Sequence, residues 1–102
     1  MYRIMIVEDD EVIARAVQQS LVSWGMDAFC VQDFSSVLAE FAVKNPQLVL
    51  MDIHLPFFNG FHWCQEIRKV SKVPVIFLSS ASDNMNIIMA VNMGGDDFIA
   101  KP

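Results

Sequence analysis

Two groups of carboxylates follow apolar segments of this sequence and could carry out chemistry together. Glu8 and Asp9 follow the first apolar segment, and Asp52 follows a central one. Carboxylate oxygens are hard ligands that suit Mg²⁺, which keeps several waters and takes only one or two carboxylates from a protein. We therefore expect Asp9 and Asp52 to bind Mg²⁺ directly, with Glu8 acting through a water.

A hydroxyl group and an amine follow two later apolar segments. Ser79 closes the fourth of these segments, and Lys101 comes just after the last. A carboxylate near Mg²⁺ and an amine can attack a phosphoryl donor, because phosphoryl transfer depends on positioning and on neutralising the equatorial oxygens. We expect Asp52 to be the attacking group, with Ser79 and Lys101 holding the phosphoryl oxygens.

Apolar segments alternate with amphipathic ones along the whole sequence, which predicts an α/β fold. The central segment at residues 48–51 is apolar without a period of two, as expected for a parallel strand buried on both faces. Apolar residues at spacings of three and four predict helices, and Asp10 and Glu11 suit a helix N-terminus. The predicted strands are residues 3–7, 27–31, 48–51, 73–78 and 97–100. The first predicted helix carries Ile13, Val17, Leu21 and Trp24 and stops at Gly25, and the second is capped by Ser35 or Ser36 and runs up to Asn45-Pro46. The other predicted helices are residues 61–69 and 83–93.

Strands that alternate with helices form a parallel sheet with right-handed crossovers and helices on both faces. Ligands bind such sheets beyond the carboxyl ends of the strands. The candidate site residues all stand at the ends of predicted strands, so we expect them to converge. They are Glu8, Asp9, Asp52, Ser79 and Lys101. A helix after the fifth strand is missing, which predicts a domain over residues 1–102 that is truncated at its C-terminus.

The amino-acid composition disfavours several classes of protein. The 102 residues are 54% hydrophobic and carry 12 acidic against 7 basic side chains, which predicts one folded domain without the basic surface that nucleic acid requires. No apolar stretch approaches the roughly 20 residues of a membrane span, and no signal peptide is apparent, so we expect a cytoplasmic protein. Cys30 and Cys64 lack metal spacing and suggest two buried thiols. Trp24 and Trp63 are expected to pack helices on the sheet.

Three motifs occur in order along the chain: Glu8-Asp9, the segment from Asp52 to Gly60 with Pro56 inside it, and the segment from Asp96 to Pro102. Together these motifs resemble those of bacterial response regulator receiver domains, and the similarity covers nearly the whole chain. The resemblance implies a flavodoxin-like, doubly wound, five-stranded parallel sheet with strand order 2-1-3-4-5. It also implies a phosphorylation-dependent switch of a two-component system, in which Asp52 accepts a phosphoryl group from a sensor histidine kinase with Mg²⁺ bound.

The same resemblance assigns roles to the other site residues. In the family, phosphorylation draws the hydroxyl residue towards the phosphate, and the aromatic residue moves inward, which remodels the fourth helix and fifth strand. A cis peptide bond before Pro102 is expected. The carried-over roles are metal ligation by Glu8, Asp9, Asp52 and the backbone carbonyl of His54, phosphate binding by Lys101, and switching by Ser79 and Phe98.

The paired acids Asp96-Asp97 before the aromatic residue are similar to those of the winged-helix transcription factor subfamily. Receivers of that subfamily dimerise through the fourth helix, fifth strand and fifth helix. Because the fifth helix lies outside this sequence, that dimer surface is expected to be incomplete here. DNA binding would belong to a missing C-terminal domain and not to this segment.

Three other protein classes could share parts of this pattern. A catalytically silent receiver-fold interaction module would not need the complete acidic site. A flavodoxin-like redox protein needs a Gly-rich phosphate loop after the first strand, where acids stand instead. A phosphatase of the haloacid dehalogenase type needs an Asp-x-Asp pair at the end of the first strand, but Asp9 is followed by Asp10 and Glu11. The first hypothesis is thus a receiver that catalyses its own phosphorylation and slow dephosphorylation, and it is not a metabolic enzyme.

Overall fold

The computed structural model describes residues 2–79 and 97–100, which form five strands and three helices around one sheet. No helix in this described part is long and apolar enough to cross a membrane. The predicted helix over residues 83–93, together with Lys101 and Pro102, lies outside the described residues. In chain order the elements are β1 (Arg3–Val7), α1 (Glu11–Ser23), β2 (Asp27–Cys30), α2 (Val37–Lys44), β3 (Leu48–Asp52), α3 (Gly60–Arg68), β4 (Val75–Ser79) and β5 (Asp97–Ala100).

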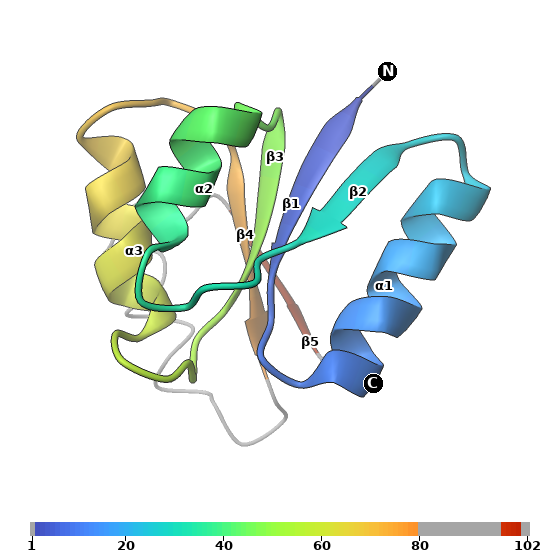
Figure 1. Ribbon diagram of the computed structural model, residues 1–102, viewed down its shortest axis with the longest axis horizontal. Helices are drawn as coiled ribbons and strands as arrows, with labels where there is room; N and C mark the ends of the chain where they lie inside the picture. Colours follow the sequence, from blue (N-terminus) through green and yellow to red (C-terminus); the bar gives the residue numbers. More distant parts are fainter. Residues whose placement is uncertain (1, 80–96, 101–102) are drawn as a thin grey trace.

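The five strands form one parallel sheet in the order β2-β1-β3-β4-β5, as predicted (Figure 1). β1 and β3 are neighbours at its centre, and Val7 of β1 pairs with Met51 of β3. The residues that follow these two, Glu8 and Asp52, therefore come at the same level of the sheet. On the other side of β3, Asp52 pairs with Leu78 of β4.

Helices cover both faces of the sheet, with α1 on one side and α2 and α3 on the other (Figure 1). Successive side chains of a strand point to opposite faces, so each central strand supplies both layers. In β1, Met5 and Val7 belong to the core beneath α2 and α3, whereas Ile4 and Ile6 belong to the core beneath α1. Burial on both faces explains why the central strands are continuously apolar.

Local signals set the ends of the helices. The Asp10 side chain accepts hydrogen bonds from the backbone N–H groups of Val12 and Ile13, at 3.0 and 3.2 Å, and so caps α1, as its acidic start predicts. After α1, Gly25 takes a φ of +86°, a conformation that glycine adopts without steric cost. Ser36 stands at the N-cap of α2, but its side chain makes no capping hydrogen bond, so the predicted serine cap does not form there.

One packing prediction was wrong. Trp24 was expected on the buried face of the first helix, but its side chain is 73% exposed. α1 ends at Ser23, and the backbone of Trp24 has already left helical geometry at φ −93° and ψ 10°. The helical spacing therefore no longer determines which way the indole points. Trp63, in contrast, is buried in the core as predicted. The two cysteines, Cys30 and Cys64, both lie in the described part of the chain, and no disulfide joins them.

Phe57 holds a strained backbone conformation in the loop between β3 and α3. Its φ is +68°, and its side chain is 76% exposed. The left-handed region costs a non-glycine residue about 1–2 kcal/mol, and an exposed ring recovers little of that through packing. We expect Phe57→Gly to raise the free energy of unfolding by about 1 kcal/mol in urea denaturation, since the relief outweighs the added flexibility of the unfolded chain. A destabilised variant would contradict this account.

Candidate functional site

Three carboxylates meet at the carboxyl ends of the two central strands. One oxygen each from Glu8, Asp9 and Asp52 lies within 4.8 Å of the other two, a spacing that could hold a metal ion. Glu8 and Asp52 are each only 3% exposed, and Asp9 faces solvent. The convergence predicted from strand ends is confirmed for these three residues, and it arises because β1 and β3 are paired in register.

The electrostatics of this cluster favour a bound cation. Two ionised carboxylates within 4.8 Å of one another, as Glu8 and Asp52 would be, repel by at least about 3 kcal/mol at an effective dielectric constant of about 20. Either a proton or a cation lowers that cost. Oxygen ligands with one solvent-facing side fit Mg²⁺, which retains part of its water shell. The donor set is thus chemically suited to the ion that the sequence predicts.

The turn from β1 into α1 orders this edge of the site. The backbone N–H of Asp10 donates to Oε2 of Glu8 at 3.2 Å, and the Asp10 side chain caps the helix. Asp10 therefore caps α1, whereas carboxylate oxygens of Glu8 and Asp9 lie close to one of Asp52. The cap that Asp10 makes agrees with the expectation that this residue marks a helix N-terminus.

The loop from β3 to α3 forms another edge of the site. Asn59 caps α3 by accepting a hydrogen bond from the N–H of His62 at 2.9 Å. The Phe58 ring stacks on the His62 ring with centroids 4.3 Å apart, and yet it remains 47% exposed. The side chain of His54 is also exposed. Both phenylalanines of this loop, Phe57 and Phe58, stay at the surface.

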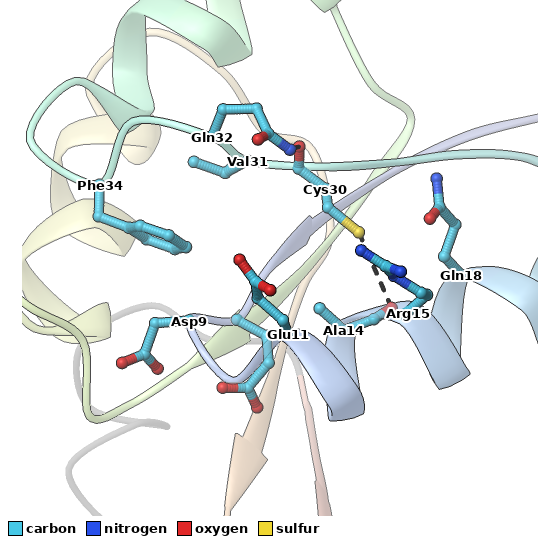
Figure 2. Close-up of a pocket in the computed structure, with 10 residues that line it drawn as sticks. Asp9, Glu11, Ala14, Arg15, Gln18, Cys30, Val31, Gln32 and Phe34 are labelled. Atoms are coloured by element: carbon cyan, nitrogen blue, oxygen red, sulfur yellow. Dashed lines mark hydrogen bonds between the residues drawn. The ribbon is translucent and has the colours of Figure 1, made fainter.

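A pocket of about 200 Å³ opens beside the carboxylates, between the start of α1 and the segment after β2 (Figure 2). Burial raises the pKa of the Cys30 thiol in this pocket, and the nearby Arg15 guanidinium only partly opposes that shift. A raised pKa keeps the thiol protonated at neutral pH, so Cys30 offers no thiolate to a metal or an electrophile. The lining residues are Glu8, Asp9, Glu11, Ala14, Arg15, Gln18, Cys30, Val31, Gln32 and Phe34.

This pocket was not predicted from the sequence, because its walls come from separate elements and follow no motif. One wall is held by Glu40 of α2, whose carboxylate accepts hydrogen bonds from the backbone N–H groups of Gln32 and Asp33 at 3.1 and 2.8 Å. Glu40 is eight positions after Gln32, and no sequence motif indicates that the two residues would be joined by a hydrogen bond. Both hydrogen bonds join α2 to the loop that leads into it from β2.

The remaining predicted site residues are described less completely. The backbone of Ser79 ends β4, where it pairs with Ala100, and the backbone of Phe98 pairs with Phe77. The fifth strand thus runs beside the fourth, as predicted, with its carboxyl end at the same edge of the sheet as Asp52. Lys101 and the predicted cis bond before Pro102 lie outside the described residues.

Residues 4–102 match the response regulator receiver domain family. The chain belongs to that family. Among curated relatives, this receiver is 45% identical over 102 residues to the sensory transduction protein BceR of Bacillus subtilis. It is 47% identical over 102 residues to the uncharacterized transcriptional regulatory protein YvcP of the same organism. Both alignments cover 100% of the chain, but only 44% of BceR and 43% of YvcP, so the receiver spans less than half the length of these relatives.

Solved structures agree with the fold and the family. The N-terminal domain of the nisin resistance regulator NsrR is 47% identical to this receiver, with a TM-score of 0.91. That alignment covers 100% of the chain and 86% of the NsrR domain. The BeF3-activated receiver domain of RstA from Klebsiella pneumoniae is 31% identical, with a TM-score of 0.91, over 97% of the chain and 85% of the RstA chain. The predicted α/β receiver fold is therefore confirmed.

Proposed function

We propose that this receiver is a phosphorylation-dependent switch whose acceptor is Asp52. The observation that carries the proposal is the buried Asp52 carboxylate within 4.8 Å of Glu8 and Asp9 at the end of the central strand. One Asp52 oxygen attacks the phosphorus atom of the donor and forms a new P–O bond. The bond from phosphorus to the donor atom breaks, and its electron pair leaves with the donor. The product is an aspartyl phosphate.

The other site residues would bind and orient the transferred group. Asp9 and Asp52 hold Mg²⁺ directly, together with the backbone carbonyl of His54, and Glu8 acts through a water. Bound Mg²⁺ supplies positive charge that offsets the charge on the phosphoryl oxygens. Lys101 and the Ser79 hydroxyl contact the same oxygens, and Ser79 and Phe98 pass the change on to the fourth helix and fifth strand. These roles follow from the family motifs at these positions.

The partners belong to the same proposal. A histidine kinase would supply the phosphoryl group from a phosphohistidine, whose imidazole nitrogen is the leaving atom. The chain covers 43% of a transcriptional regulatory protein, which supports a second, DNA-binding domain in the whole protein as the output. Dimerisation through the fourth helix and fifth strand would couple phosphorylation of the receiver to that DNA-binding domain. The receiver itself, with a formal charge of −5, is not proposed to contact nucleic acid.

Phosphorylation by acetyl phosphate tests this function without an identified kinase. The chain is incubated with acetyl phosphate and Mg²⁺, and mass spectrometry after borohydride trapping locates the modified residue. We expect one phosphate per chain, on Asp52, and no labelling when EDTA removes the metal. A chain that stays unmodified, or that carries the phosphate on another carboxylate, would refute the assignment. A folded chain that also fails to respond to beryllofluoride would favour a silent interaction module.

His54 is expected to tune the lifetime of the phosphorylated state. Its exposed side chain is two residues after Asp52 and would border the phosphate, where it limits the approach of water. We expect His54→Ala to shorten the half-life of the aspartyl phosphate severalfold without altering the site of labelling. The half-life is measured as phosphate release after the donor has been removed, with His62→Ala as the matched control. An unchanged half-life would show that the imidazole plays no part in hydrolysis.

A further inference from the structure

Helix α3 starts in direct contact with the main chain of Asp52. A Cβ atom on residue 60 would lie 2.1 Å from the carbonyl oxygen of Asp52 and 3.0 Å from Cγ of Met51. Real Cβ atoms essentially never approach another heavy atom more closely than 3.0 Å. The Asp52 oxygen is part of the backbone, so no side-chain rotation can relieve the clash. Only glycine allows α3 to begin this close to β3.

Gly60 also forms a hydrogen bond with the carbonyl group of the residue that follows Asp52. Its backbone N–H donates to the carbonyl oxygen of Ile53 at 2.9 Å. Residue 60 therefore touches two successive carbonyl groups, one through its Cα and one through its amide. The side chain of Asp52 branches from the residue that carries the first carbonyl. The second carbonyl leads directly into His54, whose own carbonyl is the proposed metal ligand.

We propose that Gly60 is a positioning residue that sets the orientation of the Asp52 carboxylate and the His54 carbonyl towards the metal. The inference rests on the function proposed above for the acidic site. A methyl group at residue 60 must push the Asp52 carbonyl away by close to an ångström or lift α3 from the strand. Metal and catalytic sites tolerate displacements of only about half an ångström.

Helix propensity predicts a more stable helix and no loss of Mg²⁺ binding, which separates it from the proposed contact effect. Alanine has a higher helix propensity than glycine, and a substitution inside the first turn of α3 would ordinarily stabilise that helix. If contact with Asp52 decides the outcome, Gly60→Ala weakens Mg²⁺ binding roughly 10- to 100-fold, the range found when groups that orient metal ligands are changed. If helix propensity decides it, Mg²⁺ binding stays unchanged.

The matched control is Asn59→Ala, which weakens the same helix start without adding an atom near Asp52. It removes the side chain that accepts a hydrogen bond from His62. Mg²⁺ affinity is measured by calorimetry, and beryllofluoride binding by near-ultraviolet circular dichroism, in sucrose to keep both variants folded. We expect Gly60→Ala to weaken both responses by the same roughly 10- to 100-fold, and Asn59→Ala to keep both. Equal losses in the two variants, or normal binding by Gly60→Ala, would overturn the proposal.

A measurement on the unsubstituted chain keeps the proposal testable if Gly60→Ala does not fold. In an NMR titration with Mg²⁺, the amide resonance of Gly60 should shift along the binding curve, because its hydrogen-bond partner lies between two metal-site residues. Gly25, where an added Cβ would meet nothing within 4 Å, should not shift. A static Gly60 resonance in a chain that binds Mg²⁺ would overturn the inference alone. A chain that binds no Mg²⁺ would overturn the proposed function itself.

Discussion

Asp52→Asn should abolish phosphorylation of the receiver while leaving its fold intact. Asparagine has nearly the same shape as aspartate, so the buried end of β3 can keep its packing, but an amide oxygen is a poor nucleophile and a weaker metal ligand. We expect the rate of labelling by acetyl phosphate to fall by at least about 10³-fold, the scale of loss when an enzyme nucleophile is removed. Labelling is quantified by intact-protein mass spectrometry, with circular dichroism to confirm the fold.

Asp10→Asn is the matched control for this prediction. Asp10 belongs to the same acidic run as Glu8 and Asp9, but its side chain caps α1. Asparagine caps helices about as well as aspartate does. The control variant should therefore fold and accept phosphate normally, although its net charge changes by the same amount. If it lost labelling as completely as Asp52→Asn, general charge at this edge of the sheet would explain the effect, and Asp52 would not be the specific acceptor.

Phe77→Ala should have the largest effect on stability. Phe77 lies in β4 with no exposed surface, and its ring centroid is 5.5 Å from that of Phe61 at the start of α3. Truncating a buried phenylalanine removes its transfer free energy and leaves a cavity, which costs about 3–5 kcal/mol. Small domains have only about 5–15 kcal/mol of stability in total. We expect this variant to unfold at a much lower urea concentration, or to be unfolded without denaturant.

The control for Phe77→Ala is the same substitution at Phe57. The Phe57 ring is exposed, so its loss leaves no cavity, and the alanine keeps the same left-handed backbone strain. The free energy of unfolding of Phe57→Ala should therefore change by no more than about 0.5 kcal/mol. Comparable losses at the two positions would mean that the ring at Phe57 contributes to the core. Such a result would also contradict the stabilisation expected for Phe57→Gly.

Most element boundaries could be predicted because they depend on local physics. β1 and β5 match their predicted ranges, and the other strands differ by one or two residues. β4 begins at Val75 rather than Val73, after Pro74, which has no N–H to donate to a neighbouring strand. Trp24 shows the limit of periodicity: the helical spacing continues through it in the sequence, but the helix ends one residue earlier, and its indole is exposed.

The order and types of residues along the chain determined the alternation of strands and helices, the sheet order implied by the family motifs, and the three acids of the site. The alternation and the strand-end acids depend on side-chain period, on caps and on strand ends, all of which are local in sequence, whereas the sheet order was implied only by the resemblance to the family. Only the tertiary structure decided that Glu8 and Asp52 are both buried side by side, that Glu40 holds the pocket wall, and that Gly60 lies against Asp52. Each of these contacts joins separate elements. Its geometry is set by how helices pack on the sheet, which no local pattern of residues specifies.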